Sequence, residues 1–249
     1  MQIERETCVG CGQCIPYCPV GAILLHPKDK ENGKKAWAEV NLDECVECGN
    51  CLRMAGCPTN AFVQQELVYP RTVRSILSDP LTVAVESGIS GRGTEEMKTN
   101  EVTGRFQPGW VGIAVELGRP ILGARLYDVE KVAMACASLG VTFEKVNPTT
   151  SMMADPTRGT FKPELLNEKV LSAIIEFAIE LERLPQLFDA LEKVSGQIET
   201  VFSLDMATRV RPDGVVPTAT FLKERSLWVA PNGKTNTGLG RPRIEETIQ

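Results

Sequence analysis

The stretch Thr7-Cys8-Val9-Gly10-Cys11-Gly12-Gln13-Cys14 recurs further along the chain as Glu44-Cys45-Val46-Glu47-Cys48-Gly49-Asn50-Cys51. A Cys-Pro pair follows each copy, Cys18-Pro19 in the first and Cys57-Pro58 in the second. Residues 7–25 and 44–64 are therefore an internal repeat, and it holds eight of the nine cysteines. We expect residues 1–66 to form one small module around this repeat, with a β-hairpin between its halves, because Asn32-Gly33 lies between two apolar runs.

The spacing of the cysteines favours iron–sulfur clusters over the other uses of clustered thiols. The motifs are Cys8-x2-Cys11-x2-Cys14-x3-Cys18 and Cys45-x2-Cys48-x2-Cys51-x5-Cys57. A [4Fe–4S] cube needs four thiolates, and three cysteines at two-residue gaps can wrap three of its corners. Zinc sites more often use separated Cys-x2-Cys pairs, and a disulfide scaffold is typical of short exported chains. The pattern predicts two [4Fe–4S] clusters, with zinc and disulfides as the alternatives.

In this cysteine run, residues 1–66 resemble the bacterial two-[4Fe–4S] ferredoxins. The fourth cysteine of each ferredoxin motif ligates the other cluster. The resemblance implies that Cys8, Cys11, Cys14 and Cys57 hold one cluster and that Cys45, Cys48, Cys51 and Cys18 hold the second. It also implies the transfer of single electrons at low potential. One departure is the gap between Cys51 and Cys57, which has five residues where the ferredoxin run has three.

The bulk composition limits the class of partner. The net charge of −5 gives no electrostatic support for binding nucleic acid or an anionic membrane. The chain has no apolar run of about eighteen residues that could span a membrane, and its N-terminus lacks the pattern of a secretion signal. We therefore expect a cytoplasmic protein without nucleic-acid or membrane partners.

After residue 66 the pattern changes to alternating strands and helices, which predicts an α+β fold. We expect a strand at 81–86, a long loop at 88–108, and then two βαβ units in residues 67–214. Together these units predict a βαββαβ sandwich of the ferredoxin-like or ACT-like type. The expected strands are 111–117, 141–146, 170–180 and 200–207, and the expected helices are 128–139 and 184–194. Asp128 is the expected N-cap of the first helix, and Gly140 is expected to end it.

Several residues outside the repeat are functional candidates. Cys136 lies on the apolar face of a predicted helix, which favours packing in the core over a role as ligand or nucleophile. The single histidine, His26, is expected at the surface of the hairpin, and tuning of a cluster is the alternative. Solvated charge is the expectation for Arg92, Lys98, Asn100 and Arg105 in the long loop, and contact with a substrate or partner is the alternative. Residues 147–153 are expected to form a crossover turn or a partner-facing loop, with Met152 and Met153 as filler of a core or interface. Residues 215–249 are expected to form an extended C-terminal tail.

A second resemblance concerns residues 70–245, where short strings such as Glu101-Val102-Thr103-Gly104-Arg105-Phe106 and Asn236-Thr237-Gly238-Leu239-Gly240-Arg241-Pro242 are similar to 6-hydroxynicotinate reductases. It implies reductive anaerobic metabolism. The first functional hypothesis is an electron-transfer subunit that takes electrons from a donor such as ferredoxin and passes them to a catalytic oxidoreductase subunit, in a hetero- or homo-oligomer. The second is a ferredoxin-dependent reductase of a heteroaromatic or cyclic substrate. The third is a redox-responsive binding module.

Overall fold

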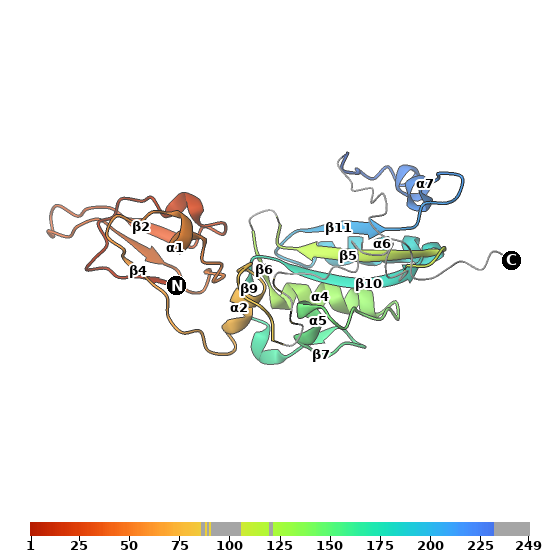
Figure 1. Ribbon diagram of the computed structural model, residues 1–249, viewed down its shortest axis with the longest axis horizontal. Helices are drawn as coiled ribbons and strands as arrows, with labels where there is room; N and C mark the ends of the chain where they lie inside the picture. Colours follow the sequence, from red (N-terminus) through yellow and green to blue (C-terminus); the bar gives the residue numbers. More distant parts are fainter. Residues whose placement is uncertain (86–87, 89, 91–105, 120–121, 232–249) are drawn as a thin grey trace.

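The chain forms two regions that lie side by side along its long axis (Figure 1). The computed structural model describes residues 1–85, 88, 90, 106–119 and 122–231. The N-terminal module is residues 1–66, and the C-terminal domain is residues 67–231. Helix α2 (Thr72–Ile76) lies where the chain passes from one region into the other.

The N-terminal module consists of short elements around its cysteines. Strand β1 (Gln2–Ile3) pairs with β4 (Phe62–Val63), so the two ends of the module lie together. The predicted hairpin is confirmed, because β2 (Ile23–His26) pairs antiparallel with β3 (Trp37–Val40). The helical elements are one 3-10 turn, η1 (Ile15–Tyr17), and helix α1 (Asn50–Met54).

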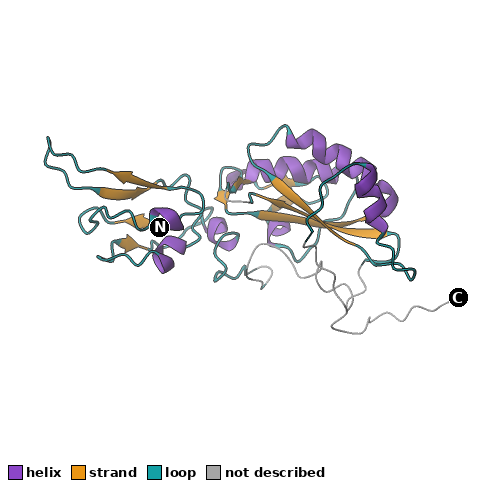
Figure 2. Cartoon of the chain, turned by 90° about the horizontal axis from the view of Figure 1, so that it is seen from above, coloured by secondary structure: helices purple, strands orange, loops and turns teal. Residues whose placement is uncertain are grey.

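The C-terminal domain is built on a three-stranded antiparallel sheet in the order β10-β5-β11. These strands are β5 (Trp110–Leu117), β10 (Ala173–Glu180) and β11 (Phe202–Ala207). Helices α4 (Leu126–Ala137) and α6 (Leu184–Ser195) form a layer over one face of the sheet (Figure 2). Alternate residues of β5 point to these helices, and all four are fully buried: Val111, Ile113, Val115 and Leu117.

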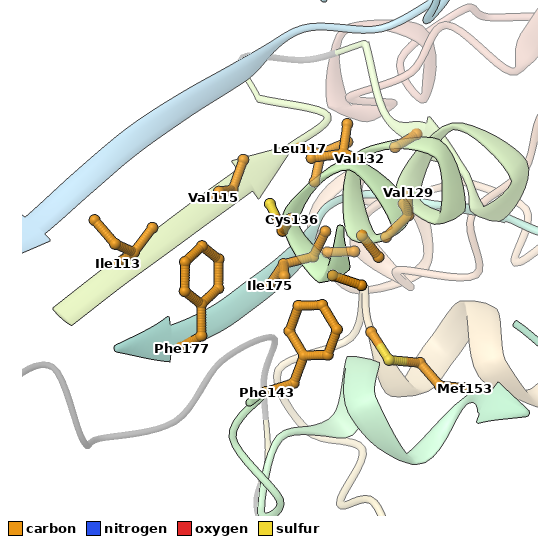
Figure 3. Close-up of a cluster of buried hydrophobic side chains, with 14 of the residues drawn as sticks. Ile113, Val115, Leu117, Val129, Val132, Cys136, Phe143, Met153, Ile175 and Phe177 are labelled. Carbon is orange, nitrogen blue, oxygen red and sulfur yellow. The ribbon is translucent and has the colours of Figure 1, made fainter. Parts of the chain in front are cut away.

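The buried core lies between this sheet and the two helices. Phe143 and Phe177 meet edge to face there, with ring centroids 6.0 Å apart. Cys136 lies among the apolar side chains of this core (Figure 3) and is 0% exposed, so the prediction that it packs in the core is confirmed. Met152 and Met153 are also buried in this core, as predicted.

The complete βαββαβ sandwich is not confirmed, because one of its four expected strands does not form. The strands expected at 111–117, 170–180 and 200–207 and both helices are present, within a few residues of their predicted bounds. Segment 141–146 makes only a single bridge, between Phe143 and Phe177. Its extension is blocked because the Asn147 side chain donates to the carbonyl of Ile174, at the edge of β10 that a longer strand would use.

The start of α4 also differs from the prediction. Arg125 precedes the first turn, and Asp128 lies inside the helix, so the expected N-cap is wrong. The Asp128 carboxylate is buried and accepts from the backbone N–H of Glu199 at 3.1 Å and from Lys131 at 2.8 Å. Asp128 therefore fastens α4 to the segment before β11. Gly140 follows the helix with a φ of +69°, as expected for a residue that ends it.

The remaining elements surround this core. The prediction of a strand at 81–86 is wrong for residues 81–85, the part that the structure describes. These residues make only the isolated bridge between Val83 and Ser90. Residues 147–153 are neither an open crossover turn nor an exposed loop, because they contain α5 (Pro148–Ser151), in which Thr149 is fully buried. The short elements are β6 (Ala124–Arg125) paired with β9 (Lys169–Val170), β7 (Met153–Asp155) paired with β8 (Thr160–Phe161), and the turns η3 (Pro163–Leu165) and η4 (Leu181–Arg183).

The C-terminal tail is not fully extended. Residues 217–224 form α7 (Pro217–Glu224), and Phe221 of this helix contacts Phe188 of α6 with ring centroids 5.0 Å apart. Residues 232–249 and the loop candidates Arg92, Lys98, Asn100 and Arg105 lie outside the described residues.

Candidate metal centres

Two cavities in the N-terminal module are each lined by four cysteines. The first cavity is lined by Cys8, Cys11, Cys14 and Cys57 together with apolar side chains such as Ile3 and Phe62. The pairing of β1 with β4 brings Cys57 to this cavity, because it returns the end of the module to its beginning.

The second cavity is lined by Cys45, Cys48, Cys51 and Cys18, with Val20, Ile23 and Val40 among its apolar neighbours. In each cavity, three cysteines come from one motif and the fourth from the other. The structure therefore brings together the same two sets of four that the sequence grouped. Their role as ligands stays a prediction. Among the described residues, no group of His, Cys, Asp and Glu side chains converges as the ligands of a single metal ion would.

Left-handed backbone lets both three-cysteine loops turn tightly. Gly10 has a φ of +65°, and a Cβ there would lie 2.5 Å from the backbone of Ala36. The equivalent position of the second motif is Glu47, which has a φ of 56° despite its side chain. Such a conformation is uncommon for a residue other than glycine and needs support from its surroundings. That support comes from Arg71, whose guanidinium bonds the Glu47 carboxylate at 2.6 Å.

Backbone N–H groups point at several of the sulfurs. Ala22 donates to the Cys18 sulfur at 3.1 Å, and Ala61 donates to the Cys57 sulfur at 3.3 Å. These are equivalent positions of the repeat, four residues after each cysteine that precedes proline. Cys8 accepts from Ala38 of the hairpin at 3.4 Å. Hydrogen bonds of this kind stabilise negative charge on sulfur and tune the potential of a bound cluster.

Three thiols of the second cavity, those of Cys45, Cys48 and Cys51, have raised pKa values and are held in their neutral form unless a cation joins them. Burial, followed by the neighbouring Cys48, Cys45 and Cys18, raises the pKa of Cys51 to about 12. Burial also raises the pKa of Cys45 and of Cys48. Four thiolates in one apolar cavity repel one another, so a positively charged group must accompany their ionisation. An iron–sulfur core supplies that charge.

The thiols of the first cavity differ among themselves. Burial raises the pKa of Cys14, and the adjacent Cys11, Cys8 and Cys57 add to that increase. Burial also acts to raise the pKa of Cys57, but hydrogen bonds from Ala61 and from Thr59 outweigh it and lower the value. The surrounding backbone therefore favours ionisation of the Cys57 thiol.

Comparison with known proteins agrees with this geometry. Residues 7–61 match the family model of 4Fe-4S dicluster domains. Over 62 residues, the chain is 45% identical to an uncharacterized ferredoxin of Methanocaldococcus jannaschii, a match that covers 24% of this chain and 71% of the relative. The chain belongs to the ferredoxin family. Its N-terminal module, residues 1–66, is a two-[4Fe–4S] ferredoxin module and is called the ferredoxin module below.

Two further relatives place the ferredoxin module among free ferredoxins and enzyme subunits. Ferredoxin-1 of Rhodobacter capsulatus is 33% identical over 70 residues, which are 28% of this chain and 94% of that protein. The delta subunit of NADH-dependent phenylglyoxylate dehydrogenase from Aromatoleum evansii is 37% identical over 49 residues, which are 20% of this chain and 44% of that subunit. No solved structure matches the chain. The similarity of residues 70–245 to 6-hydroxynicotinate reductases stays a prediction.

The C-terminal domain covers the loop of the ferredoxin module that leads into the second motif. Arg74 of α2 is 4% exposed, and its guanidinium donates to three backbone carbonyls, those of Leu42 at 3.1 Å, Asp43 at 2.7 Å and Cys45 at 2.8 Å. The same guanidinium pairs with Glu168. One buried cation thus fixes the backbone of a predicted ligand to the C-terminal domain.

A second group of ion pairs fastens the same loop. Arg125 contacts Asp43 at 2.6 Å and Glu44 at 2.8 Å, and Lys169 also pairs with Glu44. The hydrogen bond from Arg125 lowers the pKa of Asp43, and that from Lys169 lowers the pKa of Glu44. Sequence reasoning missed these cations, because each is a single Arg or Lys far along the chain from the loop that it contacts.

The first cavity is further from this interface. Cys11 is the exposed cysteine among its four, whereas Cys8 and Cys14 are 8% exposed. His26 lies at the surface of the nearby hairpin, as expected, where it stacks on Trp37 with ring centroids 4.2 Å apart and contacts Glu39 at 2.9 Å. Within the part of the chain that the structure describes, there is no helix with the length and apolar character of a membrane span.

Proposed function

We propose that this chain is an electron-transfer protein or subunit that passes single electrons at low potential through two [4Fe–4S] clusters to a partner oxidoreductase. Cys8, Cys11, Cys14 and Cys57 hold the first cluster, and Cys45, Cys48, Cys51 and Cys18 hold the second. The observation that carries this proposal is the presence of two neighbouring cavities, each lined by four cysteines with one contributed by the opposite motif.

The donor set of each cavity fits the proposed group. Four thiols around an apolar cavity match the four corners of a cube better than the point ligation of one ion. When bound, the clusters supply one-electron redox chemistry. The chain contributes the rest: the backbone N–H groups of Ala22, Ala38 and Ala61 stabilise charge on the sulfurs, and apolar side chains such as Ile23 and Phe62 limit the access of water.

The proposed acceptor is a catalytic oxidoreductase subunit that binds the C-terminal domain, and the proposed donor is a small carrier such as ferredoxin. Support comes from the fixed attachment of the second cavity to that domain through Arg74, Arg125 and Lys169. A relative named as a subunit of phenylglyoxylate dehydrogenase is consistent with an oxidoreductase complex.

The test is the metal content and redox behaviour of protein purified without oxygen. We expect about eight irons per chain and two successive one-electron reductions, which electron paramagnetic resonance monitors. Replacing Cys14 or Cys48 by Ser removes a predicted ligand, whereas Cys136→Ser is the matched control outside both cavities. Zinc in place of iron, or equal iron loss in the Cys136 variant, contradicts the proposal.

A further inference from the structure

We infer that electrons enter at the first cluster, from an acidic carrier protein that docks on the β2–β3 hairpin, and this inference rests on the function proposed above. The docking surface is defined by the exposed lysines Lys28, Lys30 and Lys34 of the hairpin tip and by Leu25 at its base. The occupant is a small redox protein with a negatively charged face.

The hairpin is fixed directly to the first cavity. The backbone of Ala36 packs against Gly10, so closely that no side chain fits at Gly10. The N–H of Ala38 on β3 donates to the Cys8 sulfur at 3.4 Å. Lys35 donates to the carbonyl of Glu6 at 2.5 Å, just before the first motif. A protein bound on this hairpin is therefore held beside the first cluster.

The exposed cysteine of that cavity has apolar neighbours which a partner can cover. Gly12 follows Cys11, and a Cβ atom at Gly12 would lie 3.7 Å from the side chains of both Ile15 and Leu25. Leu25 is 45% exposed, and Val9 on the other side of Cys11 is 52% exposed. An apolar contact beside an exposed ligand shortens the path for an electron and excludes water from it, while surrounding charges guide the approach.

The charge of the hairpin is opposite to that of the chain. Residues 23–40 contain four lysines against Asp29, Glu31 and Glu39, a net charge of +1, although the whole chain has a net charge of −5. All four lysines lie at the tip, in residues 28–35, whereas Glu39 lies on β3 and contacts His26. Asp29 is turned into the hairpin, where it accepts from the backbone N–H groups of Glu31 and Asn32 at 3.1 Å. Arg5 adds a further cation, since its guanidinium lies 4.6 Å from the centre of the Trp37 ring. A local positive patch on an acidic protein attracts an acidic partner and orients it.

The second cluster is a poorer point of entry for the same partner. Its approach from the loop at residues 42–47 is covered by the C-terminal domain through Arg74 and Arg125. Leu52 and Met54 of α1 are exposed near Cys51. The cation beside them is Arg53, and its charge is paired with Asp79 at 3.0 Å. The two clusters therefore differ in what they present to a carrier, and the hairpin favours the first.

The experiment measures how fast a reduced, strongly acidic plant-type [2Fe–2S] ferredoxin reduces the complete holoprotein in a stopped-flow instrument. In the test variant, Lys28, Lys30 and Lys34 are all replaced by Glu. The matched control replaces three exposed lysines of the C-terminal domain, Lys145, Lys193 and Lys223, so both variants have the same net charge. We expect the second-order rate constant to fall about tenfold or more in the test variant, with a weaker dependence on salt, and to change less than about threefold in the control.

A second pair of variants identifies the cluster at which electrons enter. Leu25→Glu and Leu52→Glu change residues of similar exposure, 45% and 43%, beside the first and second cluster respectively. We expect the first change to slow reduction by the acidic ferredoxin and the second to leave it within about twofold, because the partner does not cover Leu52. A larger effect at Leu52, or equal losses in the two lysine variants, overturns the inference.

Reduction by the small cation methyl viologen radical keeps this test separate from the proposed function. If it reduces every variant at the wild-type rate and the iron content is unchanged, the clusters are intact and only the docking surface is being tested. If it fails to reduce even the wild-type holoprotein, the electron-transfer function itself is wrong.

Discussion

The ferredoxin module and the C-terminal domain fill their interiors with different side chains. The buried cluster of the module contains Cys8 and Cys14 with small residues such as Ala38 and Ala61. The C-terminal domain instead buries a continuous set of large apolar residues that includes Phe177. Two-residue strands and small buried side chains contribute little free energy of folding, so the module depends on its metal. The C-terminal domain depends on packing.

The largest effect that this comparison predicts follows removal of iron. Chelation under anaerobic conditions should unfold the ferredoxin module and leave the C-terminal domain folded, because only the module uses metal as its core. Hydrogen exchange checks this directly: backbone amides of 1–66 should lose protection, while those of β5 and β10 keep it. Amides of β2 and β3 that stay protected without iron would show that the module has a sufficient core of its own.

The reverse experiment removes packing from the C-terminal domain. Phe177→Ala deletes a side chain of β10 that is 1% exposed and packed in the core, and should lower the free energy of unfolding of that domain by about 3–5 kcal/mol. Iron content should not change. Urea unfolding, monitored by hydrogen exchange, measures the effect. Val146→Ala is the control, because Val146 is 49% exposed. Iron loss in the Phe177 variant would mean that the two regions do not hold their structures independently.

An intermediate effect is expected where the regions meet. Arg74→Ala removes this donor from the carbonyls of Asp43 and Cys45 and from Glu168, whereas the carbonyl of Leu42 still accepts from Arg71. The change should cost roughly 1–3 kcal/mol. The paramagnetic resonance signal of the second cluster should change more than that of the first, since Arg74 bonds the backbone of Cys45. Arg158→Ala, at an exposed arginine, is the control. Equal changes in both signals would contradict the assignment of the interface to the second cluster.

The smallest effect concerns acid. The ion pairs of Asp43 and Glu44 lower the pKa of both carboxyl groups, so they stabilise the interface above the ordinary carboxyl pKa of about 4 and lose this effect as the pH falls below it. Both groups are partly exposed, so the loss should be only a few tenths of a kcal/mol. Urea unfolding of the holoprotein at about pH 6 and about pH 3 measures it. Arg125→Gln should reduce this difference, and an unchanged pH dependence in that variant would argue against these pairs.

The sequence predicted best what depends on local spacing. Cysteines at two-residue gaps must lie on one tight loop, and the Cys-Pro pairs marked the fourth position of each motif. The resemblance to the two-[4Fe–4S] ferredoxins then implied that the fourth cysteines are exchanged, so the two sets of four could be named in advance. The periodicity of residues 184–194 likewise predicted α6, because its apolar face is regular. In both cases, the signal lies within one short segment.

The predictions that failed depended on contacts between distant segments. Residues 141–146 have the composition of a strand, but the side chain of Asn147 takes the carbonyl of Ile174 that would continue the ladder. Asp128 is a residue type that often caps helices, but its carboxylate accepts from the backbone N–H of Glu199, which lies 71 residues further along the chain. Arg74 gave no signal at all, since its partners are backbone carbonyls, which have no signature in the sequence.

The exchange of the fourth cysteine also fixes an order of assembly during synthesis of the chain. Under the proposed ligation, the second cluster has all four of its ligands once Cys51 has left the ribosome, because Cys18 precedes it. The first cluster waits for Cys57, although its other three ligands are made earliest. Iron delivered to the growing chain before that point meets an incomplete first site. A chain that is held with Cys51 outside the ribosome and Cys57 still inside it therefore exposes three unprotected thiols, those of Cys8, Cys11 and Cys14, to oxidation.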